Sequence, residues 1–321
     1  MSPRVHKVSR PTIMTCSSAP GKIILFGEHA VVYGRPALAV PVTQVHTDVE
    51  VLDVARAGIW INAPDVDLHT ELNMLPSDHP IAAVIHNFLF LSRVSPFPSL
   101  EINISSTIPV AAGLGSGAAV TVALVRALSS HLDFPMNEEE INAFAYEIER
   151  IHHGTPSGID NTVVTFARPV YFTKGQPMEI FRVGSPFMIV IGDTGIPAPT
   201  KESVGDVKKL WEADSQKWER IFDGVGAIVR AARQAIERGN LSELGKLMNQ
   251  NHALLQEMTV SSPALDQLVS VARTVGALGA KMSGGGRGGN MIALVTPDLA
   301  ESVSRSLLQA GARNTILTQV I

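Results

Sequence analysis

Residues 109–119 read PVAAGLGSGAA and lead directly into an apolar segment. Ahead of this stretch, apolar and polar residues alternate over residues 100–104, which is typical of a strand with one buried face. After it, alanine and leucine recur at helical spacing, so we expect a helix over residues 116–132. Glycines at a helix start let an anion approach backbone N–H groups that have no partner within the helix. The stretch therefore predicts a strand, a phosphate-binding loop and a helix, with a tight turn that holds no ligand as the alternative.

A second alternative for the same loop is a dinucleotide site. Residues 113–118 satisfy the loose pattern G-x-G-x-x-G/A, and Asp133 lies about where a ribose-binding acid is expected. That acid should end a second strand, whereas Asp133 follows the predicted helix and precedes Pro135, so a nicotinamide dehydrogenase is disfavoured. The P-loop pattern is missing as well, because neither Lys22 nor Lys246, each preceded by glycine, is followed by Ser or Thr.

The composition limits the class of protein. The chain has 321 residues, of which 45% are hydrophobic and 17% charged, and this excludes a disordered protein and favours about two domains. A net charge of −4 gives no general attraction to nucleic acid. Cys16 is the single cysteine, so an internal disulfide is excluded, and no apolar run is long enough to cross a membrane. We expect a cytoplasmic protein without a nucleic-acid or membrane partner.

The first half of the chain is predicted to be rich in strands. Short apolar or alternating runs between turn residues indicate strands at residues 23–26, 37–40 and 45–52. A second helix is expected from about Asn137 to about Gly154, because three glutamates crowd its first turn, where the helix dipole favours negative charge. Residues 184–186 read GSP and form the predicted domain boundary.

The second half is predicted to be mostly helical and then alternating. A buried strand is expected at residues 187–191, followed by amphipathic, charged sequence from about 204 to 258, where Trp211 and Trp218 are interpreted as packing anchors on a helix. Helix and strand then alternate over residues 263–278, 291–295, 299–310 and 315–320. This pattern predicts a two-layer α+β second domain. The predicted organisation is a flexible tail over residues 1–15 and two domains over residues 16–185 and 186–321.

Two further glycine-bearing segments accompany the first. Residues 19–34 read APGKIILFGEHAVVYG, and residues 281–290 read KMSGGGRGGN. In their order and spacing the three segments resemble the motifs of the GHMP kinase superfamily, and within it those of the mevalonate kinases. The resemblance covers nearly everything after Cys16. It implies an α+β fold of two domains, an N-terminal mixed α/β domain and a C-terminal ferredoxin-like α+β domain, with the active site in the cleft between them.

The resemblance also implies a reaction and its residues. The expected activity is ATP-dependent phosphorylation of the primary alcohol of mevalonate to 5-phosphomevalonate, for isoprenoid synthesis. Such a transfer needs positioning, charge neutralisation and an acceptor for the hydroxyl proton. By resemblance, Asp160 is the base, Lys22 its partner, and Ser116 with Glu149 the pair that holds Mg²⁺. The residues expected to bind the nucleotide are Pro109, Ala112, Gly113, Leu114, Gly115, Ser116, Gly117 and Ala118.

Each of these residues also has a structural interpretation. Asp160 could cap a turn, Glu149 could be a solvated charge on a helix face, and Ser116 could be a plain N-cap.

By resemblance, Glu28 and His29 of the Gly-Glu-His motif face the acceptor, and Thr200 aligns with a position that contacts mevalonate in relatives.

The alternatives to mevalonate 5-phosphorylation come from the same superfamily and beyond it. Apolar residues 30–33 disfavour a sugar, whose hydroxyls need polar partners. A phosphomevalonate kinase or a mevalonate 3-kinase stays open, with Lys201 the one extra basic residue that stands out near residues 193–201, which match the family's substrate loop. A catalytically silent ligand sensor is disfavoured by retention of the catalytic residues, and a homodimer stays open.

Three positions depart from the family's common pattern. Gly117 stands where a second serine is usual, Arg287 interrupts the third glycine loop, and Asn290 replaces a common cysteine. Arg287 could grip a nucleotide phosphate or project into solvent. These departures bear on nucleotide affinity and preference rather than on the type of reaction.

Overall fold

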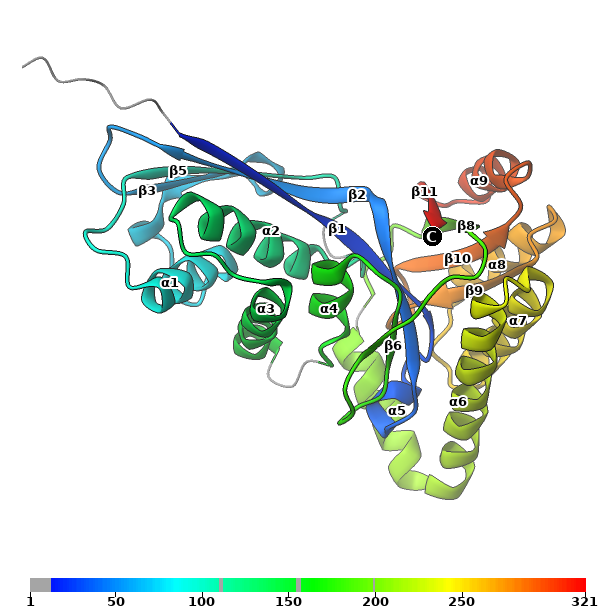
Figure 1. Cartoon of the computed structure of the whole chain (residues 1–321). Helices are drawn as coiled ribbons and strands as arrows, with labels where there is room; N and C mark the ends of the chain where they lie inside the picture. The colour runs from blue at the N-terminus through cyan, green and yellow to red at the C-terminus, as the bar shows by residue number, and fades with distance from the viewer. Residues whose placement is uncertain (1–12, 110–111, 154–156, 199) are drawn as a thin grey trace, which may run out of the picture.

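Two β-sheets lie end to end, each with its own set of helices (Figure 1). The computed structural model describes residues 13–109, 112–153, 157–198 and 200–321. The strands of the first sheet are β1 (Met14–Phe26), β2 (Ala37–Asp53), β3 (Ile59–Ala63), β4 (Leu68–Glu71), β5 (Leu100–Ser106), β6 (Val170–Phe172) and β7 (Glu179–Ile180). They are ordered β4-β3-β5-β2-β6-β7, and β1 pairs with β2.

The long antiparallel pair β1–β2 forms the spine of this sheet. It continues where the sequence predicted separate short strands, because Pro41 and residues 43–44 stay within one extended strand. The predicted tail is also too long: Met14 and Thr15 pair with Leu52 and Val51, so the strand begins inside it. Residues 1–12 lie outside the described part of the chain.

The helices beside the first sheet are α1 (Pro80–Ser92), α2 (Ser116–His131), α3 (Glu138–His153) and α4 (Ile159–Phe166). The central helix, α2, packs on β1 and β2, and on α1, α3 and α4. It is apolar almost all round, and its small residues, such as Ala119, Ala123 and Ala127, are fully buried, as a helix enclosed on several sides requires. The predicted helices over 116–132 and 137–154 are confirmed.

The second sheet has the order β11-β8-β10-β9, with every pair antiparallel. Its strands are β8 (Phe187–Asp193), β9 (Gly279–Ser283), β10 (Asn290–Val295) and β11 (Asn314–Val320), and its helices are α5 (Thr200–Ala213), α6 (Ser215–Glu237), α7 (Leu241–Glu257), α8 (Pro263–Thr274) and α9 (Ala300–Gln309). Helices separate β8 from β9 and β10 from β11, which is the ferredoxin-like β-α-β-β-α-β arrangement. This confirms the expected fold. The predicted boundary at residues 184–186 falls between β7 and β8, and the domain limits stay a prediction.

The helical stretch is divided into separate helices, and this corrects the placement of both tryptophans on one helix. Trp211 lies on α5 and Trp218 on α6. Between them Asp214 caps α6 by accepting a hydrogen bond from the backbone N–H of Lys217 at 3.1 Å. Asn240 caps α7 in the same way. None of the helices in the described ranges is long and apolar enough to cross a bilayer.

Candidate active site

The glycine loop before α2 lies against β1. The backbone N–H of Lys22 donates to the carbonyl of Leu114 at 2.9 Å. Gly113 and Gly115 have φ of 75° and 77°, a left-handed conformation that glycine adopts with little strain. A Cβ at Gly115 would lie 2.8 Å from Cγ of Lys22, so the lysine side chain occupies the space that a larger residue would fill. The loop therefore delivers the start of α2 next to Lys22.

The start of α2 is suited to an anion. Gly115 is the N-cap and Ser116 the first helical residue, so Ser116 is not the plain N-cap of the alternative interpretation. The first N–H groups of an α-helix have no partner within the helix and carry part of the positive end of its dipole. Gly117 and Gly113 have open space where a side chain would stand. Phosphate oxygens can therefore approach this backbone closely.

Lys22 and Asp160 form an ion pair. Nζ of Lys22 lies 3.1 Å from Oδ1 of Asp160, and the two side chains are 7% and 33% exposed. Lys22 comes from β1 and Asp160 from the first turn of α4. The carboxylate therefore keeps an open side while the ammonium is shielded from water.

The start of α4 is fixed by a residue that the sequence analysis did not single out. Asn142 of α3 accepts hydrogen bonds through Oδ1 from Nδ2 of Asn161 at 2.6 Å and from Oγ1 of Thr162 at 3.2 Å. Gly158 precedes the helix with φ of 84°. These contacts fix the first turn of α4. They thereby set the direction of the side chain of Asp160, the neighbour of Asn161.

Glu149 lies close enough to this pair to respond to both charges. Its pKa is raised to about 7: burial is the largest cause, the negative charge of Asp160 adds to it, and the positive charge of Lys22 partly opposes both effects. A shielded carboxylate beside a second carboxylate favours a bound cation. The described residues contain no cluster of three or more His, Cys, Asp or Glu that could hold a metal. The Glu149 carboxylate and the Ser116 hydroxyl are hard oxygen donors of the kind that Mg²⁺ prefers, and their role as a magnesium pair stays a prediction.

Glu28 and His29 lie where the first segment meets the third. His29 Nε2 donates to the carbonyl of Gly285 at 3.0 Å, which leaves Nδ1 as an acceptor. Burial lowers the pKa of His29 to about 4, only partly opposed by the hydrogen bond to Gly285 and reinforced by Arg287, so the ring is neutral at pH 7. Glu28 is buried and forms an ion pair with Lys281 of β9.

Thr200 begins α5 and lies against the third glycine loop. A Cβ at Gly285 would collide with Oγ1 of Thr200, so glycine is required at this contact. Ser203 donates to the same Gly285 carbonyl at 2.9 Å that His29 binds. His29 and Thr200, which are predicted to bind the phosphoryl acceptor, therefore both contact the third glycine loop at Gly285.

The two departures in the third loop have structural roles. Arg287 forms an ion pair with Asp206 of α5, 2.7 Å from Nη1 to Oδ2, so its guanidinium is directed to α5 rather than freely into solvent. Asn290 donates through Nδ2 to the carbonyl of Ala112 in the phosphate loop. Ser283 donates to the carbonyl of Ile24 in β1 at 2.7 Å. The third loop thus joins the two sheets.

Comparison with known proteins now assigns the family. The model named GHMP kinases N terminal domain matches residues 81–168, and the model named GHMP kinases C terminal matches residues 232–313. A mevalonate kinase from Pyrococcus abyssi is 36% identical over 315 residues, covering 93% of this chain and 93% of that protein. The chain belongs to the GHMP kinases.

Other mevalonate kinases are similar over the full length of this GHMP kinase. The protein from Saccharolobus solfataricus is 31% identical over 312 residues, covering 96% of this chain and 98% of that one. The crystal structure of the L. major mevalonate kinase in complex with R-mevalonate matches with a TM-score of 0.84 and 29% identity, covering 98% of both chains. The enzyme therefore has both the fold and the sequence of a family in which phosphoryl transfer is the shared chemistry.

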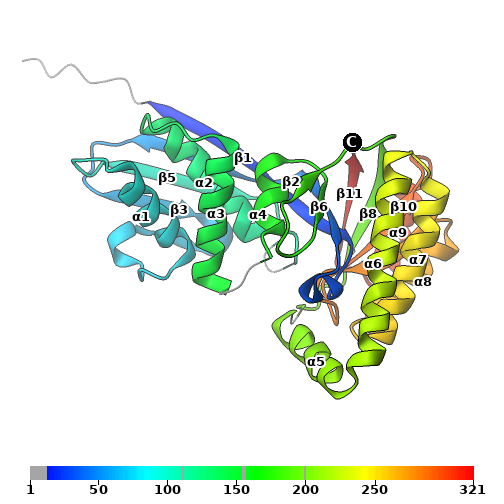
Figure 2. The same ribbon diagram turned by 60° about the horizontal axis from the view of Figure 1, so that its bottom comes forward.

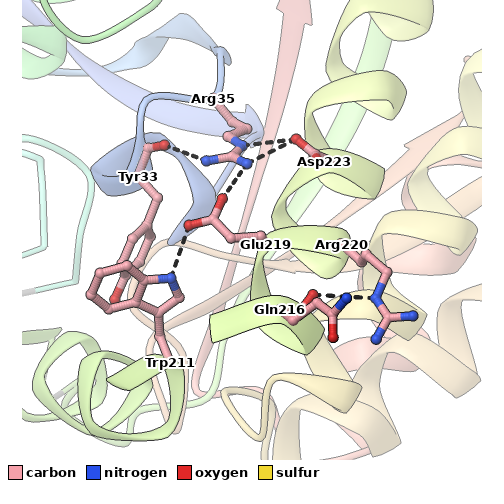
Figure 3. Close-up of polar contacts among 7 residues, drawn as sticks. All are labelled: Tyr33, Arg35, Trp211, Gln216, Glu219, Arg220 and Asp223. Atoms are coloured by element: carbon pink, nitrogen blue, oxygen red, sulfur yellow. Dashed lines mark hydrogen bonds and ion pairs between the residues drawn. The ribbon is translucent and has the colours of Figure 1, made fainter. Parts of the chain in front are cut away.

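A polar cluster anchors residues 33–35, at the end of the first glycine-bearing segment of this GHMP kinase, to the helices of the second half (Figure 3). The Arg35 guanidinium binds the carboxylates of Glu219 and Asp223, the latter at 2.9 Å, and the carbonyl of Tyr33 at 2.7 Å. Trp211 donates through Nε1 to Glu219 at 2.9 Å, so the predicted packing anchor also hydrogen-bonds. In the turned view, α5 lies beside the 3-10 helix at residues 30–33 (Figure 2). The cluster explains that placement.

The structure brings most predicted site residues together around the point where the two sheets meet. Lys22, Asp160 and Glu149 form one group with the glycine loop, and Glu28, His29 and Thr200 meet the third loop. Sequence reasoning missed two residues, Asn142 and Lys281. The signal for the second was available: a lysine interrupts an otherwise apolar run just before the third glycine loop, which indicates a buried charge with a partner.

Proposed function

We propose that this GHMP kinase transfers the terminal phosphoryl group of ATP to the primary alcohol of mevalonate, giving 5-phosphomevalonate and ADP. The observation that carries the proposal is the ion pair between Lys22 and Asp160 beside the glycine loop. It supplies a proton acceptor and a fixed positive charge next to backbone N–H groups suited to phosphates. The full-length similarity to proteins named mevalonate kinases supports mevalonate as the acceptor.

In the proposed reaction the ATP phosphates bind the N–H groups at the start of α2. The Asp160 carboxylate accepts the proton of the acceptor's hydroxyl group as its oxygen bonds to the terminal phosphorus. The bond from that phosphorus to the bridging oxygen breaks, and ADP leaves. Lys22 stabilises negative charge on the nucleophile and the transferring group. Mg²⁺, held by Ser116 and Glu149, would offset charge on the phosphate oxygens.

Acceptor recognition is proposed to involve Glu28, His29 and Thr200. The L. major enzyme was crystallised with R-mevalonate, and its close structural match supports the same acceptor here. A neutral His29 offers Nδ1 as a hydrogen-bond acceptor to a hydroxyl group. We also propose that the reaction takes place in the cytoplasm, since the single cysteine, Cys16, is an exposed free thiol.

The test is ADP release with ATP and Mg²⁺ over mevalonate, phosphomevalonate, homoserine and galactose. We expect turnover with mevalonate alone. Phosphorus NMR then identifies the product, since a primary phosphate ester couples to two neighbouring CH₂ protons and a tertiary ester has no such protons. Turnover confined to phosphomevalonate, or a tertiary ester as product, would replace this function by another kinase of the family. The Asp160→Ala variant is the control for contaminating kinases.

A further inference from the structure

Lys281 is a charged residue buried inside the molecule. Its side chain is 0% exposed, on the edge strand β9 of the second sheet. Nζ donates to Oε1 of Glu28 and to the carbonyl of Met282 at 2.6 Å, and it lies 5.9 Å from the ring of Phe26. Glu28 follows the end of β1, more than 250 residues earlier in the chain. The pair therefore joins the first glycine-bearing segment, residues 19–34, to the strand that leads into the third glycine loop.

Burial of this pair is costly in free energy. Removing an ammonium and a carboxylate from water costs several kcal/mol per ion after relaxation, by general estimates, and apolar residues of similar volume are often at least as stable. Burial accordingly lowers the pKa of Lys281, partly opposed by Glu28. A charged pair whose burial is this costly, next to predicted acceptor residues, points to a role in function.

The backbone around Lys281 is held rigidly. Asn249 accepts a hydrogen bond from one neighbouring residue of β9 at 3.0 Å, and Arg273 donates to the carbonyl of that residue at 2.6 Å. His252 accepts from the N–H of the other neighbour at 3.3 Å. Side chains from α7 and α8 thus occupy the free edge of the strand. The backbone that carries the Lys281 ammonium is therefore held in place relative to Glu28.

Glu28 and His29 retain unused hydrogen-bonding capacity. Oε2 of Glu28 and Nδ1 of His29 are buried and have no hydrogen-bond partner among the residues that the structure describes. Both atoms are acceptors, the first because the carboxylate is paired with an ammonium through its other oxygen. Two buried acceptors without donors, on successive residues of the chain, match a ligand that brings hydroxyl groups.

We propose that Lys281 is a positioning residue for the acceptor: by holding Glu28 it directs the free Oε2, together with Nδ1 of His29, to hydroxyl groups of the substrate. The inference rests on the proposed function, because it concerns the same site. Lys281 itself touches no reacting atom in this scheme. Its loss should therefore weaken binding of the acceptor, through Glu28, more than binding of ATP.

The test is a double-mutant cycle on the full chain with Lys281→Met, Glu28→Gln and both together. Removing one partner of a buried pair is strongly unfavourable, so we expect each single change to raise the KM for mevalonate at least about tenfold. The KM for ATP should change less than about threefold. In the Glu28→Gln background, adding Lys281→Met should change the KM for mevalonate by less than about threefold, since Lys281 acts through Glu28. Val303→Ala, a buried truncation in α9, controls for lost stability.

Three outcomes would overturn the proposal: an unchanged acceptor KM in Lys281→Met, equal increases for both substrates, or an effect of Lys281→Met that is the same in both backgrounds. If the single variants fail to fold, the double variant, which removes both buried charges, is measured by itself and tests the proposal. Its KM for mevalonate should be raised at least about tenfold, and a parental value would contradict the inference. If the parent does not turn over mevalonate, the proposed function fails first, and the cycle is measured with whichever acceptor the parent uses.

Discussion

The ammonium of Lys22 lies 3.1 Å from Oδ1 of Asp160, although one residue belongs to a strand of the sheet and the other to the first turn of a helix beside it. Two independent supports produce this distance. The bond from Lys22 N–H to Leu114 fixes the lysine beside the glycine loop, and Asn142 fixes the start of α4. A pair built from such supports is preorganised, which is how an enzyme places charge before the reaction begins.

We predict that Asp160→Ala and Lys22→Met each lower kcat at least about tenfold, because a positioned proton acceptor alone contributes on the order of 10²–10⁴ in rate. Both variants should keep the parental circular dichroism spectrum. Asp298→Ala, at an exposed carboxylate, is the matched control and should keep parental kcat. Coupled ADP release measures all three. Parental turnover in either site variant would remove that residue from the catalytic set.

The glycine loop offers a matched pair of substitutions. Gly115→Ala introduces a Cβ 2.8 Å from Cγ of Lys22 at a φ of 77°, so it must displace the lysine or distort the loop. Gly117 has ordinary φ and open space, and a serine is usual at this position in the family, so a Cβ here is compatible with phosphate binding and Gly117→Ala should change kcat little. We expect kcat to fall at least about tenfold in the first variant and less than about twofold in the second, by analogy with loss of a positioned group. Equal effects would show that the contact with Lys22 is not what requires glycine.

Local pattern predicted much of this molecule. The alternation at Leu100, Ile102 and Ile104 gave a strand that buries those three residues, and glycine followed by an apolar helical segment gave the start of α2. Those features depend on neighbours in the sequence. The beginning of β1 at Met14 was missed because pairing with β2, and not alternation, extends the strand there.

In the candidate site, too, some residues could be identified from the sequence, whereas the roles of others depend on partners far away in the chain. Residues within the three glycine segments were identified by their resemblance to a family. Lys281 lay in one of those segments, yet its role depends on Glu28, and periodicity carries no information about a partner so distant in the chain. The same holds for Arg287, whose partner Asp206 lies on a helix assembled from another part of the sequence.

The ion pair of Arg287 with Asp206 predicts which substrate it affects. The guanidinium is engaged with α5, the helix that begins at Thr200, so Arg287→Ala should leave the KM for ATP within about threefold and raise that for the acceptor about two- to fivefold, as an exposed ion pair allows. Asp206→Asn breaks the same pair and should match it. A tenfold or larger rise in the KM for ATP, seen with Arg287→Ala and not with Asp206→Asn, would instead assign Arg287 to the nucleotide.

The raised pKa of Glu149 predicts a dependence of stability on pH. Burial, and then the charge of Asp160, raise it from an ordinary 4.5 to about 7. Between these pH values the folded chain keeps a proton that the unfolded chain has lost, so the free energy of unfolding falls as pH rises through this window. Glu149→Gln cannot titrate and escapes this loss. At pH 8 without metal it should be more stable than the parent by on the order of 1–3 kcal/mol, and near pH 4.5 the difference should vanish.

Mg²⁺ should remove the stability advantage of Glu149→Gln over the parent at pH 8. An ionised Glu149 is the form that binds the cation, so Mg²⁺ should raise the melting temperature of the parent at pH 8 and have little effect on Glu149→Gln, which should also lose turnover. Glu147→Gln, two residues away on the same helix and exposed beside Arg150, is the matched control and should show no such response. Thermal unfolding at pH 5 and pH 8, with and without Mg²⁺, measures these differences. A glutamine variant that is less stable than the parent at pH 8 without metal would mean that Glu149 is already charge-compensated by the protein, and the carboxylate would then have no reason to recruit a cation.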